Sequence, residues 1–567
     1  MEKPWLAHYE KEVPHTIDYP KIPLHQTLED SARKYPDHTA IKLVLRYLGP
    51  LTMGAKLTYR QLLDQVNRFA AALAALGVKK GDRVALMLPN LPQFVISFYG
   101  ALKLGAIVVN TNPTYTAREI EHQFSDAGVE TVVLLSAFYS KLKEVQANTQ
   151  VKRVIVADVS DYVPAPFDSL VKRKLHEDGL MVEVPEGNGV YAYRKLLDAH
   201  PEAPPMIAVS SDETAFFQYT GGTTGVPKAA MLSHFNLVAN TVQVRRWMVT
   251  LEEGKERVMG AIPFFHVYGM TVAMSLAIYL GAELIVLPNP RPIDGVMKAI
   301  DKERATVFPG VPTMYIGIIN HPEVGKYDLK SVKACISGAA PLPMDVQTKF
   351  GEITGGRLVE GYGLTEAAPV SHCNPIYGLR KAGSIGVPFP DVEAKIMDYD
   401  KLEEKPLGEG GELWLRGPQV MKGYWGQPDE TAKTITEDGW LRTGDIARMD
   451  SDGYFYIVDR LKDIIIASGF NIVPREVEEV LFEHPKVQEA VVAGVPDAYR
   501  GETVKAYVVL KPGETTTAEE IIKFCSERLA PYKVPKQLEF RSDLPKTQVG
   551  KFLRRVLVEE EKKKLAQ

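Results

Sequence analysis

The sequence has few cysteines, little net charge and no evident targeting segment. Its 567 residues include only three cysteines, Cys335, Cys373 and Cys525, and none of them stands in a Cys-x-x-Cys spacing. A disulfide framework and a cysteine-based metal site are therefore not expected, and this cysteine usage fits a reducing cytoplasm. The formal net charge of −4 disfavours nucleic acid as the main partner.

No stretch predicts a membrane-spanning helix. The first residues contain no apolar signal region. The stretch 264–282 lacks Asp, Glu, Lys and Arg, but Gly269 and Gly281 interrupt it and a strand-like run follows at 283–288. A buried helix followed by a strand of a parallel sheet explains this pattern better than a bilayer span. Peripheral contact with the inner face of the membrane and a homodimer both stay open.

The composition is otherwise that of a globular protein with more than one domain. Hydrophobic residues make up 45% of the chain and charged residues 24%, and the length exceeds what one hydrophobic core usually organises. Helical and strand patterns alternate through most of the first 385 residues, which predicts βαβ units and parallel sheets. Shorter alternating runs separated by Gly, Pro and Asp follow, and they predict a small β unit.

A compact α+β pattern closes the chain, and Pro474 is placed to open a helix within it. We therefore predict an α/β protein. Its large N-terminal domain, 1–460, consists of parallel-sheet α/β subdomains plus the small β unit, and a small α+β C-terminal domain, 461–567, follows. Two segments are less regular: we expect 157–205 to be a surface excursion and 45–55 to be an irregular loop.

The run 219–228, Tyr-Thr-Gly-Gly-Thr-Thr-Gly-Val-Pro-Lys, is the most informative stretch. An apolar strand is expected to lead into it, and its glycines and threonines offer backbone N–H groups and hydroxyls without Cβ obstruction. A polyphosphate needs such donors together with a cation. The run differs from the P-loop motif because Lys228 follows Pro227 and precedes Ala229. A Gly/Thr-rich turn that binds nothing is the alternative.

Two further runs combine glycine turns with polar side chains that suit other parts of a nucleotide. In 360–366, Glu-Gly-Tyr-Gly-Leu-Thr-Glu, the glycines let backbone approach a flat ring stacked on Tyr362, and Glu366 offers a hard oxygen ligand for Mg²⁺. In 440–445, Trp-Leu-Arg-Thr-Gly-Asp, the carboxylate of Asp445 suits contact with a ribose diol. A glycine-punctuated turn and an Asx-turn are the respective alternatives.

Two weaker motifs follow the three runs described above and bring the number of candidate site motifs to five. The charged run 459–463 lies between domain-like segments, with an exposed linker as its alternative, and 544–551 ends in Gly-Lys. In this order the five runs resemble the adenylate-forming superfamily of acyl-CoA synthetases, luciferases and peptide-synthetase adenylation domains, over residues 25–557. Further family motifs match at 263–269, 337–341 and 468–471. The chain looks most similar to bacterial long-chain fatty-acid–CoA ligases, including at 420–424 and 530–535.

The resemblance implies a ligase reaction in two steps, with Mg²⁺ as cofactor and ATP and CoA as co-substrates. A fatty-acid carboxylate attacks the α-phosphate of ATP, which gives acyl-adenylate and pyrophosphate, and the CoA thiol then displaces AMP. No protein nucleophile is needed, so the protein positions groups and neutralises charge. The resemblance also implies that the C-terminal domain is mobile and turns between the two steps.

By the same resemblance, individual residues receive roles. The catalytic set would be Lys551, which bridges the acyl carboxylate and the α-phosphate, with Lys228, Thr365, Glu366 and His266. The nucleotide would be bound by Thr220, Gly221, Gly222, Thr223, Thr224, Gly225, Lys228, Gly338, Ala339, Glu360, Gly361, Tyr362, Gly363, Thr365, Asp445, Arg460, Lys462 and Lys551, and Mg²⁺ by Glu366. The acyl pocket would be bordered by His266, Val267, Tyr268, Met270 and Gly338, the CoA tunnel by Ser468, Gly469 and Phe470, and Lys462 would be the hinge.

The chain departs from the family pattern at three positions. Gly221 replaces a usual Ser or Thr, and Ala229 replaces a usual Gly, but neighbouring amides and threonines preserve the phosphate cradle. Met270 stands where some long-chain relatives have a gate tryptophan, which leaves the limit on chain length open. The alternative to an acyl-pocket role for His266 is a histidine of the core whose ring nitrogens are hydrogen-bonded.

Other activities compete with the long-chain one. An aryl- or medium-chain acid–CoA ligase stays open, because Tyr268 also suits an aryl substrate. Peptide-synthetase adenylation is disfavoured because the stretch after His266 lacks a Phe-Asp start. A catalytically silent acyl- or nucleotide-binding protein is the alternative of a different class, and the retained Lys551, Glu366 and Asp445 argue against it.

Overall fold

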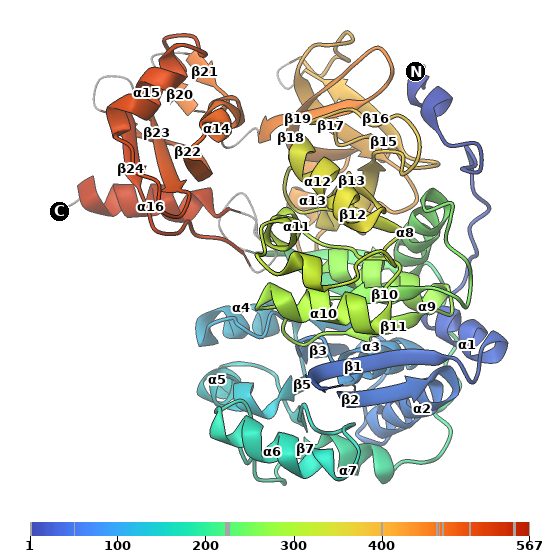
Figure 1. The fold of residues 1–567 in the computed structure, drawn as a ribbon. Helices are drawn as coiled ribbons and strands as arrows, with labels where there is room; N and C mark the ends of the chain where they lie inside the picture. The colour runs from blue at the N-terminus through green and yellow to red at the C-terminus, as the bar shows by residue number, and fades with distance from the viewer. Residues whose placement is uncertain are drawn as a thin grey trace. The chain divides into compact units, whose positions relative to one another are not determined.

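The computed structural model describes residues 3–49, 51–220, 227–398, 401–460, 463, 465–467, 470–497, 501–547 and 552–565 (Figure 1). By their internal contacts the residues form two compact units. The large unit consists of Leu6–Glu393 and Arg416–Leu441, and the small unit of Met1–Trp5, Ala394–Leu415 and Arg442–Gln567. The β strands between 394 and 460 thus group mainly with the C-terminal residues, whereas the boundary at residue 460 stays a prediction from the sequence.

The large unit contains a seven-stranded sheet of order β7-β6-β5-β3-β4-β8-β9, parallel except for the last pair. Its strands are β3 (Arg83–Met87), β4 (Ile107–Asn110), β5 (Thr131–Leu135), β6 (Arg153–Ala157), β7 (Val190–Ala192), β8 (Thr214–Thr220) and β9 (Lys228–Ser233). The connecting helices include α2 (Tyr59–Ala75), α3 (Pro92–Lys103), α4 (Ala117–Ala127), α5 (Tyr139–Val145) and α8 (His234–Trp247). Every residue of β5 is buried, as expected for a parallel strand covered on both faces. The predicted α/β class is confirmed.

A second sheet of order β10-β11-β1-β2 corrects the prediction for residues 45–55. Instead of an irregular loop, β1 (Thr39–Leu48) and β2 (Leu51–Thr58) pair antiparallel up to Leu48 and Leu51, as Figure 1 shows in blue. A Cβ at Gly54 would lie 1.9 Å from the carbonyl oxygen of Leu43. The pairing register shifts next to this position, so the glycine marks a bulge within a strand. The other strands are β10 (Arg257–Gly260) and β11 (Glu283–Val286), and α1 (Leu24–Lys34) precedes β1.

The expectation that 157–205 is only a surface excursion is wrong for its last part. Strand β7 adds an edge to the seven-stranded sheet, and α7 (Tyr193–Asp198) packs on α2, where the rings of Tyr193 and Phe69 stack with centroids 5.7 Å apart. The earlier helix α6 (Phe167–Glu177) is mostly exposed. Short elements between polar loops show no clear period, so only tertiary packing identifies β7 and α7.

Helix and strand follow each other in 264–286, as predicted. The helix begins with a π-helical segment, η4 (Gly269–Ser275), and continues as α9 (Leu276–Tyr279) before β11. Gly269 is required because a Cβ there would lie 2.2 Å from the carbonyl oxygen of Pro263. Across the described parts of the chain, no helix is both long and apolar enough to cross a bilayer.

A third sheet of the large unit has the order β12-β13-β14-β15. It contains β12 (Ala334–Ser337), β13 (Arg357–Gly363), β14 (Val370–Cys373) and β15 (Val387–Pro388), and α10 (Ile293–Glu303), α11 (Pro312–Ile319) and α12 (Met344–Thr354) belong to the same region. Cys335 is completely buried in its core, as predicted. The parallel pair β12–β13 ends at Ser337 and Glu360, and both family motifs of this region continue from these ends.

The small unit contains two sheets. The first has the order β16-β17-β18-β19, with β16 (Glu393–Met397), β17 (Gly411–Arg416), β18 (Leu441–Met449) and β19 (Phe455–Arg460). The second contains β20 (Ile465–Ala467), β21 (Phe470–Ile472), β22 (Val487–Asp497), β23 (Gly501–Leu510) and β24 (Gln537–Phe540), with helices α14 (Pro474–Glu483), α15 (Ala518–Ser526) and α16 (Arg554–Leu565). The predicted helix at Pro474 and the predicted β unit are confirmed.

Candidate nucleotide-binding site

The two described ends of the glycine- and threonine-rich run lie opposite each other. Thr220 ends β8 and Lys228 begins β9, and their backbones are paired in the antiparallel register. The apolar lead-in is therefore a strand, as predicted, and its core positions are buried. Gly221, Gly222, Thr223, Thr224 and Gly225 lie outside the described residues. The pairing of β8 with β9 thus holds the two described ends of the run side by side.

Lys228, the first residue of β9, is a buried cation. Its side chain forms an ion pair with Glu430 on α13 (Pro428–Thr434), and its Nζ lies 5.3 Å from the centre of the Tyr424 ring. Hydrogen bonds from Lys228 and then Lys433 lower the pKa of Glu430 to about 2. The ammonium is thus held between a carboxylate and an aromatic face, both in the large unit.

The second motif continues from β13 into a short helical turn, η6 (Thr365–Ala367). Glu360 is buried, and one of its carboxylate oxygens accepts a hydrogen bond of 3.2 Å from the Leu342 N–H. A Cβ at Gly363 would lie 2.1 Å from the carbonyl oxygen of Pro369, so only glycine fits there. The half-buried ring of Tyr362 meets that of His372 edge-on with centroids 6.0 Å apart.

Glu366 is the carboxylate that the sequence assigns to Mg²⁺. It is half-buried, and its Oε1 accepts a hydrogen bond of 2.9 Å from the Tyr424 hydroxyl. Within the described ranges, no group of three or more His, Cys, Asp or Glu side chains is arranged to hold a metal ion. Mg²⁺ commonly binds through one or two carboxylates together with substrate phosphates and water. A single carboxylate oriented by a hydrogen bond fits that mode.

The predicted adenine and acyl residues meet at Gly338. A Cβ at Gly338 would lie 3.1 Å from the ring of Tyr268, so this glycine allows the ring to pack against backbone. The Tyr268 hydroxyl donates to the carbonyl oxygens of Ile336 at 2.7 Å and Gly310 at 3.0 Å. Burial is the main cause that raises the pKa of Tyr268 well above its usual range. Ala339 next to it has a positive φ of 69°.

The other predicted acyl residues differ in burial. Val267 and Met270 are completely buried, and Met270 lies in the π-helical segment. His266 is half-buried, and its Nδ1 accepts a hydrogen bond of 3.2 Å from the Tyr268 N–H. His266 is therefore a turn residue at the start of the helix and not a histidine of the core.

In the small unit, Asp445 on β18 is buried and its backbone lies opposite that of Arg460 on β19. The Asp445 N–H donates to the Thr443 hydroxyl at 3.1 Å, directly after the positive-φ turn at Gly444. Phe470 begins β21, opposite Ala467. Lys462, Ser468, Gly469 and Lys551 lie outside the described residues, so their roles stay predictions.

Two residues of the large unit gain importance only from the structure. The family motif at 420–424 contains Tyr424 without giving it a role, and Glu430 belongs to none of the motifs. Both contact predicted site residues that are far away in the sequence, namely Glu366 and Lys228. No local pattern near residues 424–430 signals these contacts, because the partners belong to other elements.

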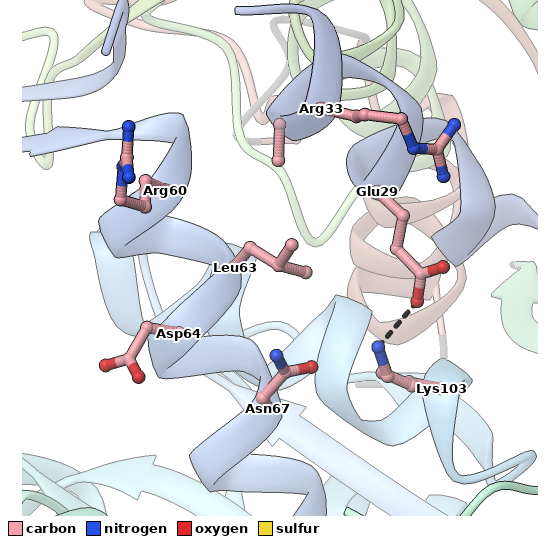
Figure 2. A pocket seen from close by; sticks show the side chains of 8 residues that line it. Glu29, Arg33, Arg60, Leu63, Asp64, Asn67 and Lys103 are labelled. Atoms are coloured by element: carbon pink, nitrogen blue, oxygen red, sulfur yellow. Dashed lines mark hydrogen bonds and ion pairs between the residues drawn. The ribbon is translucent and has the colours of Figure 1, made fainter. Parts of the chain in front are cut away.

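A surface pocket of about 480 Å³ between α1, α2 and α3 contains none of the predicted site residues (Figure 2). Figure 2 shows Glu29 and Lys103 pointing toward each other, at a distance of 2.5 Å. The other charged residues that line the pocket, Arg33, Arg60 and Asp64, also have ion-pair partners on neighbouring turns or loops. Charges that are satisfied within the protein do not indicate a ligand, and we assign no function to this pocket.

Comparisons with known proteins agree with the motifs. The family of AMP-binding enzymes matches residues 28–425, and the AMP-binding enzyme C-terminal domain matches 476–551. A long-chain-fatty-acid–CoA ligase of Bacillus subtilis is 48% identical over 99% of this chain and 98% of its own length. One of Escherichia coli O157:H7 is 41% identical over 100% and 99%. The crystal structure of ATP-bound MatB from Rhodopseudomonas palustris superimposes with a TM-score of 0.82 at 29% identity, over 95% of this chain and 99% of that one. The ordered motifs, the fold and these matches together establish that the chain belongs to the family of AMP-binding enzymes.

Proposed function

We propose that this protein is a long-chain-fatty-acid–CoA ligase. The observation that carries the proposal is the 48% identity to a Bacillus subtilis ligase of that kind, which extends over nearly the whole of both chains. The substrates are small molecules: a fatty acid, ATP and CoA. Mg²⁺ completes the set as cofactor. Peripheral contact with the inner face of a membrane, which would suit a lipid substrate, and a homodimer are further parts of the proposal.

The first step joins a carboxylate oxygen of the fatty acid to the α-phosphorus of ATP and breaks the bond to the β-phosphate oxygen, so pyrophosphate leaves. Thr220 and Lys228, with the loop between them, bind the β- and γ-phosphates, and Thr365 contacts phosphate. Mg²⁺ bound near Glu366 would neutralise phosphate charge. Lys551 stabilises the charge shared by the acyl carboxylate and the α-phosphate.

The second step joins the CoA sulfur to the acyl carbon and breaks the acyl–phosphate bond, which releases AMP. The adenylate already carries a good leaving group, so positioning is the main contribution of the protein. Asp445 and Arg460 hold the ribose, and their opposed backbones on β18 and β19 support a shared task. Ser468 to Phe470 border the CoA tunnel, and Lys462 is the hinge.

The acyl group lies along His266 to Met270 and Gly338 in this proposal. The packing of Tyr268 against Gly338 supports a wall of aromatic and backbone atoms there. An aromatic wall would also suit an aryl acid, so an aryl- or medium-chain acid–CoA ligase is the second candidate. Both candidates share the adenylation chemistry and differ only in this pocket.

The test is ATP–pyrophosphate exchange without CoA, with acetate, octanoate, palmitate, oleate, 4-coumarate or a mixture of amino acids as the acid. We expect the highest exchange rate with palmitate or oleate. A maximum with octanoate or 4-coumarate would favour the second candidate. Exchange with none of these acids would contradict both ligases and favour a silent acyl- or nucleotide-binding protein.

A further inference from the structure

Residues 421–425, which we call the connector, link β9 to the turn that contains Glu366. The Lys422 N–H donates to the Met231 carbonyl at 2.9 Å, and the Trp425 N–H donates to the Ala229 carbonyl at 2.9 Å. At its other end the Met421 N–H donates to the Glu366 carbonyl at 2.8 Å. The connector is therefore fixed by backbone hydrogen bonds to both elements that carry predicted phosphate and metal ligands.

Tyr424 lies in this connector and contacts both charged groups. Its hydroxyl donates to Glu366 Oε1 at 2.9 Å, and Lys228 Nζ lies 5.3 Å from the centre of its ring. The side chain is 8% exposed, and its backbone N–H donates to the Thr431 hydroxyl at 2.9 Å. One buried and anchored side chain thus touches the predicted metal carboxylate and the predicted phosphate lysine.

The hydrogen bond between Tyr424 and Glu366 joins a hydroxyl donor to a carboxylate acceptor at 2.9 Å. Hydrogen bonds to carboxylates are charge-assisted and stronger than those between neutral groups. Such a bond fixes which carboxylate oxygen remains available to a cation.

We propose that Tyr424 is a positioning residue that orients Glu366 toward the Mg²⁺ of Mg·ATP and supports Lys228 with its ring. The inference rests on the proposed function, because it assumes that Mg·ATP is the ligand of this site. It adds a role for a residue that does not itself contact substrate. Glu430, on the helix α13 that follows the connector, completes the arrangement as the counter-ion of Lys228.

The test removes only the hydroxyl, by Tyr424→Phe, and keeps the ring under Lys228. Binding of ATP to the full-length protein, without fatty acid or CoA, is measured by calorimetry once with Mg²⁺ and once with EDTA. We expect binding of Mg·ATP to weaken about tenfold or more, the range seen when a hydrogen-bond partner of a metal ligand is removed. Binding of metal-free ATP should not change.

Tyr59→Phe is the matched control. The Tyr59 hydroxyl is completely buried and donates to the carbonyl oxygens of Ala282 at 2.8 Å and Ala277 at 3.1 Å, among residues to which no role in the site is assigned. This variant loses two buried hydrogen bonds, but we expect it to bind both forms of ATP as the unmodified protein does. Loss in the control equal to that in Tyr424→Phe would overturn the inference.

A double-mutant cycle with Glu366→Gln separates positioning from a general structural effect. If Tyr424 acts through Glu366, the double variant should bind Mg·ATP no more weakly than Glu366→Gln alone. Additive losses, or an equal loss with and without Mg²⁺, would overturn the inference. If the unmodified protein binds Mg·ATP but shows no pyrophosphate exchange, only the proposed function is contradicted. If the unmodified protein shows exchange and Tyr424→Phe binds Mg·ATP as tightly as it does, only the role of Tyr424 is contradicted.

Discussion

Lys228 in the large unit and Lys505 in the small unit have closely similar surroundings, yet we expect them to serve different purposes. Both are 7% exposed and both form ion pairs with glutamates. Each Nζ lies near a tyrosine ring, at 5.3 Å from the centre of Tyr424 for Lys228 and 5.1 Å from that of Tyr507 for Lys505. Burial, pairing and an aromatic neighbour therefore do not by themselves identify a functional lysine.

The difference lies in how the partners are arranged. Lys505 lies within β23 and pairs with Glu539 and Glu561, each at 2.8 Å, and both glutamates also pair with Lys564 on α16. This is a closed network that joins strands and helix of one unit. Lys228 begins β9, shortly after a run that is rich in glycine and threonine, and Glu430 pairs with it from the short helix α13. We expect this buried cation to exchange its carboxylate partner for a phosphate.

The largest expected effect on stability is that of Lys505→Met. Removing the Lys505 ammonium leaves the carboxylates of Glu539 and Glu561 with fewer positively charged partners. The free energy of unfolding should therefore fall by about 3 kcal/mol. Hydrogen-exchange protection of the β22 and β23 amides measures the loss, and Lys562→Met, at an exposed lysine of α16, is the control. Unchanged protection would show that the network does not stabilise the unit.

Lys551→Ala extends the comparison to a lysine with a predicted catalytic role. Loss of a preorganised transition-state charge costs roughly 3–4 kcal/mol, so adenylation should fall by orders of magnitude. Thioester formation from supplied acyl-adenylate should be largely preserved. Single-turnover assays of the two steps check this, and equal losses in both would contradict the role given to Lys551.

Lys228→Met should show the reverse pattern to Lys505→Met. A charge-assisted bond to phosphate contributes about 1.5–3 kcal/mol, so the apparent affinity for ATP in the exchange assay should fall by one to two orders of magnitude. Stability should change little, because Glu430 keeps Lys433 as a partner at 2.8 Å. Strong destabilisation with unchanged exchange would remove the distinction between the two lysines.

The smallest expected effect is a loss of stability in acid, to which the ion pairs of Lys228 and those of Lys505 both contribute. Hydrogen bonds from Lys228 lower the pKa of Glu430 to about 2. For Glu539, burial raises the pKa, but hydrogen bonds from Lys505 and Lys564 outweigh it and bring the pKa to about 2. Because both folded values lie below the ordinary value of 4.5, this stabilisation is complete above about pH 4.5 and is lost as the pH falls toward 2.

Urea midpoints between pH 5 and pH 2.5 measure this loss. Glu430→Gln and Glu539→Gln should each flatten the pH dependence, since amides do not titrate in this range. A dependence that stays as steep in both variants would show that other carboxylates cause the acid lability.

Local chemistry makes several elements predictable from the sequence. Thr58 and Gln61 form the capping box that begins α2, Pro474 opens α14, and the apolar run before the glycine- and threonine-rich motif forms β8. Each depends on side chains within a few residues of each other, so the information is contained in a short window. The order of the motifs along the chain likewise suffices to indicate the family.

The tertiary structure decided what short windows do not contain. The β1–β2 hairpin joins a sheet because β1 pairs with the distant strand β11, and the edge strand β7 pairs with β6. The contacts of Tyr424 with Glu366 and of Glu430 with Lys228 join segments that are separate in the sequence. The sequence by itself determined which residues carry charge, hydroxyls and flexibility. Only the fold decided which of them meet, because burial and pairing energies depend on neighbours in space and not on neighbours along the chain.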